Sequence, residues 1–335
     1  MKRIFTLLFA VLTATTIMAQ MHGPMKFVGA SNMTVSTMSN DNPSDTILFA
    51  MNGMESGNIT LPAMKGMQTI PSFTISGAKF TLGENHVVTF ADQTFSTKVK
   101  VDGAEKKITG TSLSGTYNMA DNSLMLTVVF QYGKMPFPMT YTVKGYYVKA
   151  VSNPITVTVG GQFTYNNDNV TYELRRYKDG GTDKLDVTVP SYSLTNTVMG
   201  DLTLGTYTVK GLVYDEAQGG YYRDYKNDGL KFHFTAVNGG KTTMDKDYEF
   251  AKEKANNILV KYEGSNVSSI VNTFQMGAMP FGIVSVFSAP ATSIEGVNAN
   301  ATAPADGRTY NLAGQRVDNN YKGIVIVNGK KYLRK

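Results

Sequence analysis

Three histidines are the side chains of this 335-residue chain best suited to bind a metal or transfer a proton, yet their spacing supports neither role. The nearest two, His22 and His86, are 64 residues apart, whereas zinc ligands usually come in pairs a few residues apart. His233 falls on the solvent face of an alternating stretch. The sequence has no cysteine, which excludes disulfides, thiolate metal sites and cysteine nucleophiles. We expect structural or solvent-exposed roles for the histidines, and no metal.

Hydroxyl and carboxylate side chains form no better catalytic pattern. Ser112 and Ser114 lie between two glycines, but not at the Gly-x-Ser-x-Gly spacing of a nucleophile elbow, which also needs a strand-to-helix turn. A glycosidase needs two facing carboxylates, and nothing in the sequence singles out such a pair. The acidic turns at 41–45 and 166–169 lack the ligand order of a calcium loop. The sequence therefore predicts a protein that is not an enzyme and carries no cofactor.

Methionine is unusually frequent in the first part of the chain. Twelve of the 18 methionines lie between Met21 and Met139. Pairs such as Met51 and Met54 could offer thioethers to Cu(I), but residues three apart point to opposite faces of a strand. Our main interpretation is that these flexible side chains fill an irregular core, and the alternative is a deformable wall around an apolar ligand.

The elements that position these side chains are predicted to be β-strands. Charged residues make up 17% of the chain, and runs such as Phe95, Thr97 and Val99 alternate with polar neighbours. Alternation with period two is typical of strands with one buried face. Asn, Asp and Gly separate the runs, as turns require. We predict an all-β protein, with one short helix over 244–256 because of its Ala, Glu and Lys content.

The N-terminal segment 1–19 has the three parts of a secretory signal peptide. A positive end at Lys2 and Arg3 precedes an apolar stretch that is too short to span a membrane, and cleavage is expected between Ala19 and Gln20. We therefore expect export to the periplasm, the outer-membrane surface or the medium, and no integral membrane segment.

An eight-residue segment occurs twice, 144 residues apart, with six identical positions. Phe130–Phe137 reads Phe-Gln-Tyr-Gly-Lys-Met-Pro-Phe, and Phe274–Phe281 reads Phe-Gln-Met-Gly-Ala-Met-Pro-Phe. Pro136 and Pro280 cannot donate to a β-ladder, so the segment is expected at a strand end or bulge. It is interpreted as a structural corner with buried phenylalanines, or else as a rim that contacts a ligand. In the second case the contacting residues would be Phe130, Met135, Phe137, Phe274, Met279 and Phe281.

Other segments match in the same order. Residues 59–62 parallel 187–190, and residues 73–77 parallel 207–211. With the repeated octet, these segments resemble the calycin-like (lipocalin-like) β-barrel domain of exported Gram-negative bacterial proteins. The resemblance covers 27–149 and 152–289 and implies two tandem antiparallel barrels with no established activity. The lipocalin Gly-x-Trp signature is missing, because the chain has no tryptophan.

The C-terminal part is predicted to be separate. A linker rich in Ala, Asn, Thr and Pro spans 290–305, and residues 306–335 form a small β unit with Asn328-Gly329 as a hairpin turn. The elements Tyr310–Gln315 and Gly323–Lys331 are similar to a C-terminal segment that acts as a sorting signal in exported proteins of the same bacteria. The resemblance implies secretion machinery as a partner of this tail.

These observations favour an exported binding protein. An eight-stranded barrel can hold one small ligand, and we expect an apolar or amphipathic one, enclosed in the methionine-rich first barrel. The alternative is a surface interaction or structural protein whose barrel loops bind a glycan or a host protein. Of the net charge of +6, Lys2 and Arg3 contribute +2 and residues 306–335 contribute +5, so residues 20–305 are nearly neutral. A nucleic-acid partner is therefore not expected.

Overall fold

The computed structural model describes residues 23–65, 69–83, 86–277, 279–288, 309–311, 317, 322–327 and 330–334. The predicted signal peptide 1–19 with its cleavage site, and the predicted linker 290–305, lie outside these residues. All named elements of the described part are β-strands, which confirms the predicted fold class. Within these ranges no helix is long and apolar enough to cross a membrane.

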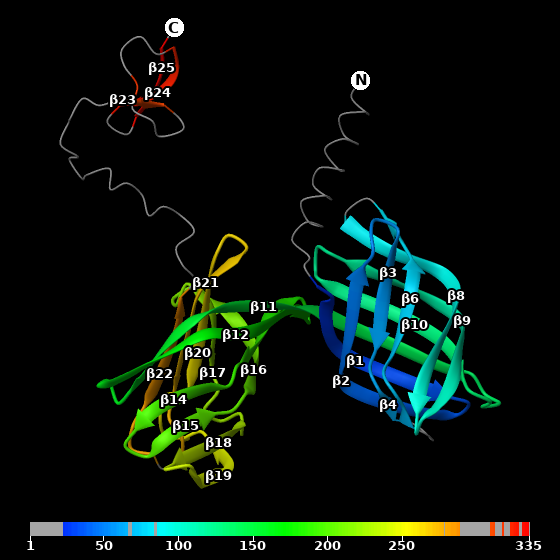
Figure 1. Cartoon of the computed structure of the whole chain (residues 1–335), viewed down its shortest axis with the longest axis horizontal. Helices are drawn as coiled ribbons and strands as arrows, with labels where there is room; N and C mark the ends of the chain where they lie inside the picture. The colour runs from blue at the N-terminus through cyan, green and yellow to red at the C-terminus, as the bar shows by residue number, and fades with distance from the viewer. Residues whose placement is uncertain are drawn as a thin grey trace. The chain divides into compact units, whose positions relative to one another are not determined.

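The first barrel is an eight-stranded antiparallel ring (Figure 1). Along the sheet its strands run in the order β6, β3, β2, β1, β11, β10, β9 and β8. Their bounds are β1 (Met25–Val35), β2 (Met38–Met51), β3 (Ser56–Leu61), β6 (Phe73–Lys79), β8 (Val87–Val101), β9 (Ala104–Asn118), β10 (Ser123–Tyr132) and β11 (Met139–Val159). The short strands β4 (Met64–Lys65) and β5 (Thr69–Ile70) form a separate hairpin, and β7 (Thr81–Leu82) pairs with β8.

The side chain of Gln93 bridges the two ends of this sheet. Its amide oxygen accepts the Lys79 N–H at 2.8 Å, and its amide nitrogen donates to the Lys79 carbonyl at 2.7 Å. Gln93 lies at an irregularity of β8, where the register with β9 shifts on both sides. One side chain thus joins β6 to β8 with two bonds of the kind that a backbone ladder would supply.

Aromatic and methionine side chains fill the interior of the first barrel. Phe27, Phe49 and Phe90 are completely buried or nearly so, and the rings of Phe49 and Phe90 meet edge to face at 5.3 Å. Four methionines are also buried there, which supports the interpretation of methionine as core filler. They are Met25, Met33, Met64 and Met139.

The second barrel is a ring closed by ladder hydrogen bonds throughout. β11 pairs with β12 on one side and with β22 on the other, and every intervening neighbour is antiparallel. The remaining strands in ring order are β12 (Phe163–Asp179), β13 (Thr182–Val189), β16 (Tyr207–Asp215), β17 (Gly220–Asp224), β20 (Asn257–Glu263), β21 (Asn266–Phe274) and β22 (Ile283–Ser288). The described structure therefore contains the two tandem barrels that the sequence predicts.

Strand β11 belongs to both barrels. Its first half pairs with β1 and β10, and its second half pairs with β12 and β22. The predicted boundary between residues 149 and 152 therefore lies inside one continuous 21-residue strand. Pro154 is accommodated because the register with β12 shifts between Asn153 and Ile155, so its missing N–H does not interrupt the ladder.

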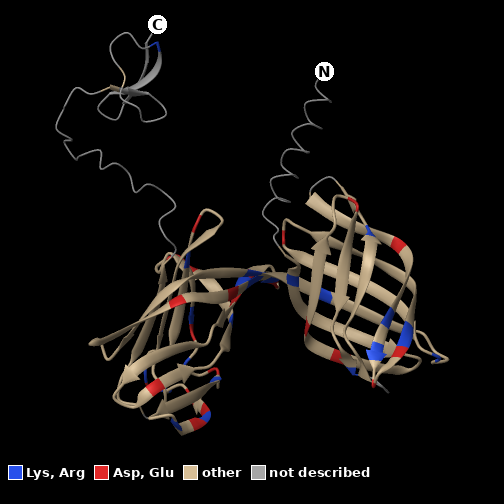
Figure 2. Ribbon diagram, viewed as in Figure 1, with Lys and Arg blue, Asp and Glu red and all other residues tan. Residues whose placement is uncertain are grey.

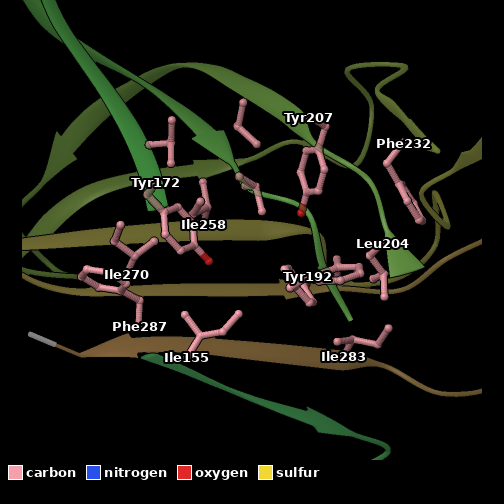
Figure 3. Close-up of a cluster of buried hydrophobic side chains, with 14 of the residues drawn as sticks. Ile155, Tyr172, Tyr192, Leu204, Tyr207, Phe232, Ile258, Ile270, Ile283 and Phe287 are labelled. Atoms are coloured by element: carbon pink, nitrogen blue, oxygen red, sulfur yellow. The ribbon is translucent and has the colours of Figure 1, made fainter. Parts of the chain in front are cut away.

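A second, four-stranded sheet covers one end of the second barrel (Figure 1). Its strands are β14 (Tyr192–Thr197), β15 (Gly200–Leu204), β18 (Lys231–Asn238) and β19 (Lys241–Glu249). Leu204 and Phe232 of this sheet are buried in the same core as the barrel strands (Figure 3). The short helix predicted over 244–256 is wrong, because Met244 and Tyr248 lie on β19. Their spacing of four fits one face of a strand as well as one face of a helix.

The C-terminal residues form a separate compact unit, 289–335. Strands β23 (Thr309–Asn311), β24 (Gly323–Val327) and β25 (Lys330–Arg334) make a three-stranded antiparallel sheet, as the predicted β unit requires. Val327 pairs with Lys330, which leaves a two-residue connection at the predicted Asn328-Gly329 turn, itself outside the described residues. Charged positions in the two barrels are scattered, with acidic and basic residues interspersed along the strands (Figure 2).

Candidate functional site

The repeated octets form the same corner in both barrels. Gln131 donates its side-chain N–H to the Met135 carbonyl at 2.5 Å, and Gln275 makes the same bond to Met279 at the same distance. Gly133 donates its N–H to a neighbouring strand and has a φ of 60°, a region that favours glycine. These contacts support the interpretation of the octet as a structural corner.

The predicted site residues lie at these two corners and do not come together. Phe130 and Phe274 are buried in the two separate cores, while Phe137 and Phe281 are 53% and 50% exposed. Met135 and Met279 are partly buried and pack against the core of their own barrel. A ligand contact by these six residues therefore stays a prediction.

A hollow of about 620 Å³ lies at the end of the second barrel where β11 enters it, and Asn122 and Tyr147 of the first barrel also line it. The hairpins β12–β13, β16–β17 and β20–β21 turn at this end, whereas the four-stranded sheet is inserted at the other. We call it the mouth hollow. Its wall includes Tyr214, Tyr221 and Tyr262, and the buried side chains of Leu174 and Leu185 form its floor.

The tyrosines of the mouth hollow pack on one another in a row. The Tyr221 ring meets Tyr214 at 5.7 Å and Tyr262 at 5.9 Å, both edge to face. Burial raises the pKa of Tyr262 to about 12, and burial also raises the pKa of Tyr221, so both phenols are neutral at physiological pH. Tyrosine rings of this kind offer an apolar face together with a polar hydroxyl.

Positive charge accompanies the aromatic wall. The Arg176 guanidinium lies 5.5 Å from the centre of the Tyr221 ring, and its Nη2 donates to Asp183 Oδ2 at 2.8 Å. The hydrogen bond to Asp183 raises the pKa of Arg176 further above its ordinary value. Lys149 also lines the hollow and donates to the Ser265 carbonyl at 3.0 Å. Two cations against one carboxylate leave the mouth hollow with a net positive charge.

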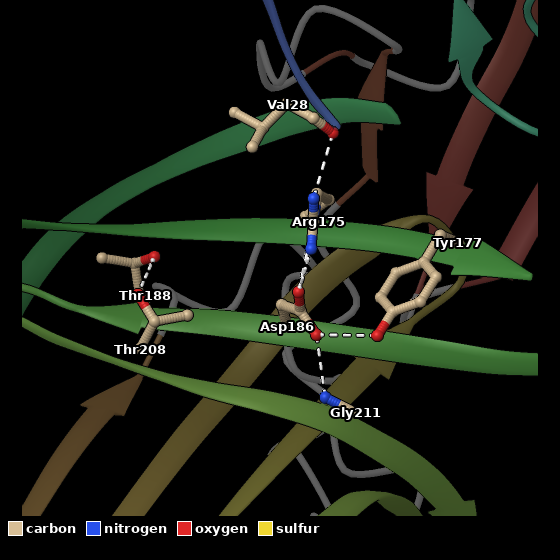
Figure 4. Close-up of polar contacts among 7 residues, drawn as sticks. All are labelled: Val28, Arg175, Tyr177, Asp186, Thr188, Thr208 and Gly211. Atoms are coloured by element: carbon tan, nitrogen blue, oxygen red, sulfur yellow. Dashed lines mark hydrogen bonds and ion pairs between the residues drawn. The ribbon is translucent and has the colours of Figure 1, made fainter. Parts of the chain in front are cut away.

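The charged residues beside the mouth hollow form a different kind of site. Asp186 is 4% exposed, and its carboxylate accepts hydrogen bonds from Arg175, from Tyr177 at 3.1 Å and from the Gly211 N–H at 2.8 Å (Figure 4). Arg175 also donates to the Val28 carbonyl of β1 at 3.0 Å. Every member of this network has a protein partner, so we assign it a structural role.

Among the described ranges, no group of three or more His, Asp or Glu side chains is placed to hold a metal ion. His233 is exposed, as predicted, and its two ring nitrogens each lie 2.9 Å from a carboxylate oxygen, one on Asp245 and one on Asp247.

Residues 25–146 match the family model of the Calycin-like beta-barrel domain. The first barrel is a calycin-like β-barrel domain. The matched segment ends within β11, just before that strand passes from the calycin-like domain into the second barrel. The second barrel has the same succession of strands, including the octet at the end of β21 where the calycin-like domain has it at the end of β10.

A solved structure of a Bacteroides fragilis NCTC 9343 protein, described as a "putative outer membrane protein", aligns with most of this chain. It has 15% sequence identity, and the match covers 78% of this chain and 94% of that one with a TM-score of 0.25. A similarity at this score supports no statement about the present chain. No curated protein matches the sequence.

The sequence did not point to the mouth hollow. Arg176, Tyr221 and Tyr262 lie on three strands separated by as many as 86 residues, and only closure of the ring brings them together. A signal was present in the concentration of tyrosines around the Gly219-Gly220 turn, but without the strand register it did not indicate a site.

Proposed function

We propose that the protein binds a small amphipathic ligand, with its anionic group, at the mouth of the second barrel. The observation that carries the proposal is the mouth hollow itself, a tyrosine-walled space with a cation beside it and an apolar floor. Its volume of about 620 Å³ falls within the range of small-molecule sites, about 300–1,000 Å³.

The lining determines which ligand fits. Leu174 and Leu185 offer apolar contact at the floor, and the three tyrosines offer ring faces along the wall. Arg176 is still 53% exposed in its side chain, so it can hydrogen-bond a carboxylate or sulfate without first being desolvated. An apolar body with one anionic end satisfies all three features.

The location of the site differs from the sequence-based expectation. The methionine-rich calycin-like domain was expected to enclose the ligand, and this stays a prediction, since four of its methionines are buried in its core. The tyrosine-rich second barrel offers the hollow with both an aromatic wall and charge.

Export belongs to the same proposal. The predicted signal peptide supports secretion, and the separate C-terminal β unit supports a role for the tail in sorting by a secretion system. Mass spectrometry of the mature protein should find an N-terminus near Gln20, and a cytoplasmic protein starting at Met1 would contradict export.

The alternative of surface recognition is favoured by one observation. A hollow of about 530 Å³ lies on the calycin-like domain over β1, β9, β10 and β11. Polar side chains such as Asn32, Thr127 and Thr142 line it together with Met125, which is 48% exposed. A glycan or a host protein would be recognised by such an open surface, on which hydroxyl and amide groups lie beside apolar side chains.

Calorimetric titration of the mature chain with oleic acid tests the main proposal. We expect saturable binding that Arg176→Gln weakens about tenfold, because a hydrogen bond to a charged group contributes about 1.5–3 kcal/mol. Lys98→Gln is the matched control, since Lys98 is an exposed cation paired with Glu105 in the calycin-like domain. Absence of binding, or equal loss in both variants, would refute the proposal.

A further inference from the structure

Below the floor of the mouth hollow, the second barrel contains polar side chains where the calycin-like domain has apolar ones. Thr60 corresponds to Thr188, because residues 59–62 parallel residues 187–190. Thr60 pairs with Leu48 and Thr188 pairs with Glu173, so the residues before these partners, Ile47 and Tyr172, occupy equivalent positions. Leu61 pairs with Phe73 and its counterpart Val189 pairs with Tyr207, so Tyr207 occupies the position of Phe73. Counted from the octet, Asn272 occupies the position of Val128.

These residues belong to a buried group of hydroxyl and amide side chains, which we call the hydroxyl cluster. It comprises Tyr172, Tyr192, Tyr207, Tyr225, Asn272 and Ser285. Tyr225 donates to the Asn272 amide oxygen at 2.8 Å, and the Asn272 amide donates to the Tyr207 hydroxyl at 2.6 Å. Figure 3 shows Tyr172, Tyr192 and Tyr207 among the apolar core side chains.

Three hydroxyls of the cluster have no hydrogen-bond partner in the protein. They are those of Tyr172, Tyr192 and Ser285, all buried to at least 96% of the residue surface. A buried hydroxyl without a partner is costly, and such groups are rare in native proteins. Burial raises the pKa of Tyr172 to about 12 and that of Tyr192 well above its ordinary value, and the Ser285 hydroxyl lies near both phenols but makes a geometrically acceptable hydrogen bond to neither. Both phenols are therefore neutral donors.

We infer that the hydroxyl cluster is a second, uncharged subsite that binds a hydroxyl or carbonyl oxygen of the same ligand. This inference rests on the proposed function. Tyr172 and Leu174 are buried on the face of β12 that also carries Arg176, which is exposed at the rim, and the Cα atoms of Tyr172 and Arg176 are about 13 Å apart along the strand. Among the described residues the buried charged side chains are Asp45 and Asp186, and Asp186 is already bound by Arg175 and Tyr177, so a second charge on the ligand would be desolvated without compensation.

The ligand class follows from these two subsites. It is an amphipathic acid that carries a neutral oxygen about 13 Å from its anionic group, as a mid-chain hydroxy fatty acid does. Binding would require the buried side chains of Leu174 and Leu185 to move aside, so that a chain entering from the mouth hollow could reach the cluster. The calycin-like domain lacks this pattern, because Ile47, Phe73 and Val128 are apolar.

The test compares ricinoleic acid with oleic acid, which differ by one hydroxyl, in calorimetric titrations of the mature chain. We expect ricinoleic acid to bind at least about threefold more tightly, as one neutral hydrogen bond allows. Tyr172→Phe and Tyr192→Phe remove only the hydroxyl and keep the ring, so each should reduce this preference while oleic acid binds as before. Tyr132→Phe is the matched control, because Tyr132 also has a buried hydroxyl without a partner but lies in the calycin-like domain.

The outcomes separate the two claims. If both acids bind equally and Arg176→Gln weakens both, the mouth site stands and the inference is wrong, with the cluster hydrated by buried water only. If neither acid binds, the proposed function and the inference both fall. A preference for ricinoleic acid that survives Tyr172→Phe and Tyr192→Phe would also overturn the inference.

Discussion

The Asp186 carboxylate accepts the Gly211 N–H at 2.8 Å, and this bond repeats one in the calycin-like domain. There Asn58 accepts the N–H of Gly77 at 3.1 Å, with φ at 68° for Gly77 and 70° for Gly211. The second barrel thus holds the same bend with a carboxylate in place of an amide, and Arg175 balances the added charge.

Removing the Asp186 side chain should destabilise the protein strongly. Asp186→Ala leaves Arg175 without a carboxylate partner and the Gly211 N–H without its acceptor, and breaking a buried ion pair from one side costs about 3–5 kcal/mol. Asn58→Ala should cost less, about 1 kcal/mol, because only neutral bonds are lost. Urea unfolding measures both. Equal losses in the free energy of unfolding would show that the charge of Asp186 contributes nothing to the bend at Gly211.

The corner glutamines should contribute equally to their two barrels. Gln131→Ala and Gln275→Ala each remove one side-chain bond to a carbonyl and should each lower the free energy of unfolding by about 1 kcal/mol. Gln162→Ala is the control, since that residue is exposed. An effect no larger than that of the control would mean that backbone contacts alone hold the octet.

His233 should make stability depend on pH. Hydrogen bonding to Asp247 is the main cause that raises its pKa above 6.5, so folding favours the charged imidazolium. The stabilisation is fully present below 6.5 and is lost as pH rises through the raised pKa. Urea midpoints of wild type and His233→Gln should therefore differ most in mildly acidic solution and converge at alkaline pH. A difference that grows with pH would contradict this sign.

The C-terminal unit should be dispensable for folding of the barrels. Residues 289–335 form a compact unit of their own, so their deletion should leave the thermal midpoint of the remaining chain unchanged. Cell fractionation should show altered localisation if the tail sorts the protein. A truncated chain that unfolds at lower temperature yet reaches the same compartment would reverse both expectations.

The sequence predicted the fold well because the decisive features are local. Alternation identifies strands directly, and the repeated octet with Phe130 and Phe274 shows the duplication without any structure. The sequence could not show that β11 is shared, since the predicted barrels end at residue 149 and begin at 152, whereas β11 runs through with a bulge at Pro154. The helix over 244–256 failed because tertiary pairing with β18 decides between two periods that fit the same residues.

The site was harder to predict for a physical reason. Arg176, Tyr221 and Tyr262 contact one another only after distant strands close into a ring, and composition does not reveal that closure. Methionine content suggested a cavity in the first barrel; Met25 and Met33 are buried in its core, and a ligand there stays a prediction. The polar replacements Tyr172 and Asn272 become visible only when the strand registers align the two barrels.

A crystal structure of the mature chain with bound oleic acid tests the central claim most directly. We predict electron density for the fatty acid in the mouth hollow, with its carboxylate within hydrogen-bond distance of Arg176 and its chain against Tyr221 and Leu174. Density for the ligand inside the calycin-like domain, or on the outer face beside Met125, with the mouth hollow free of ligand, would contradict the account.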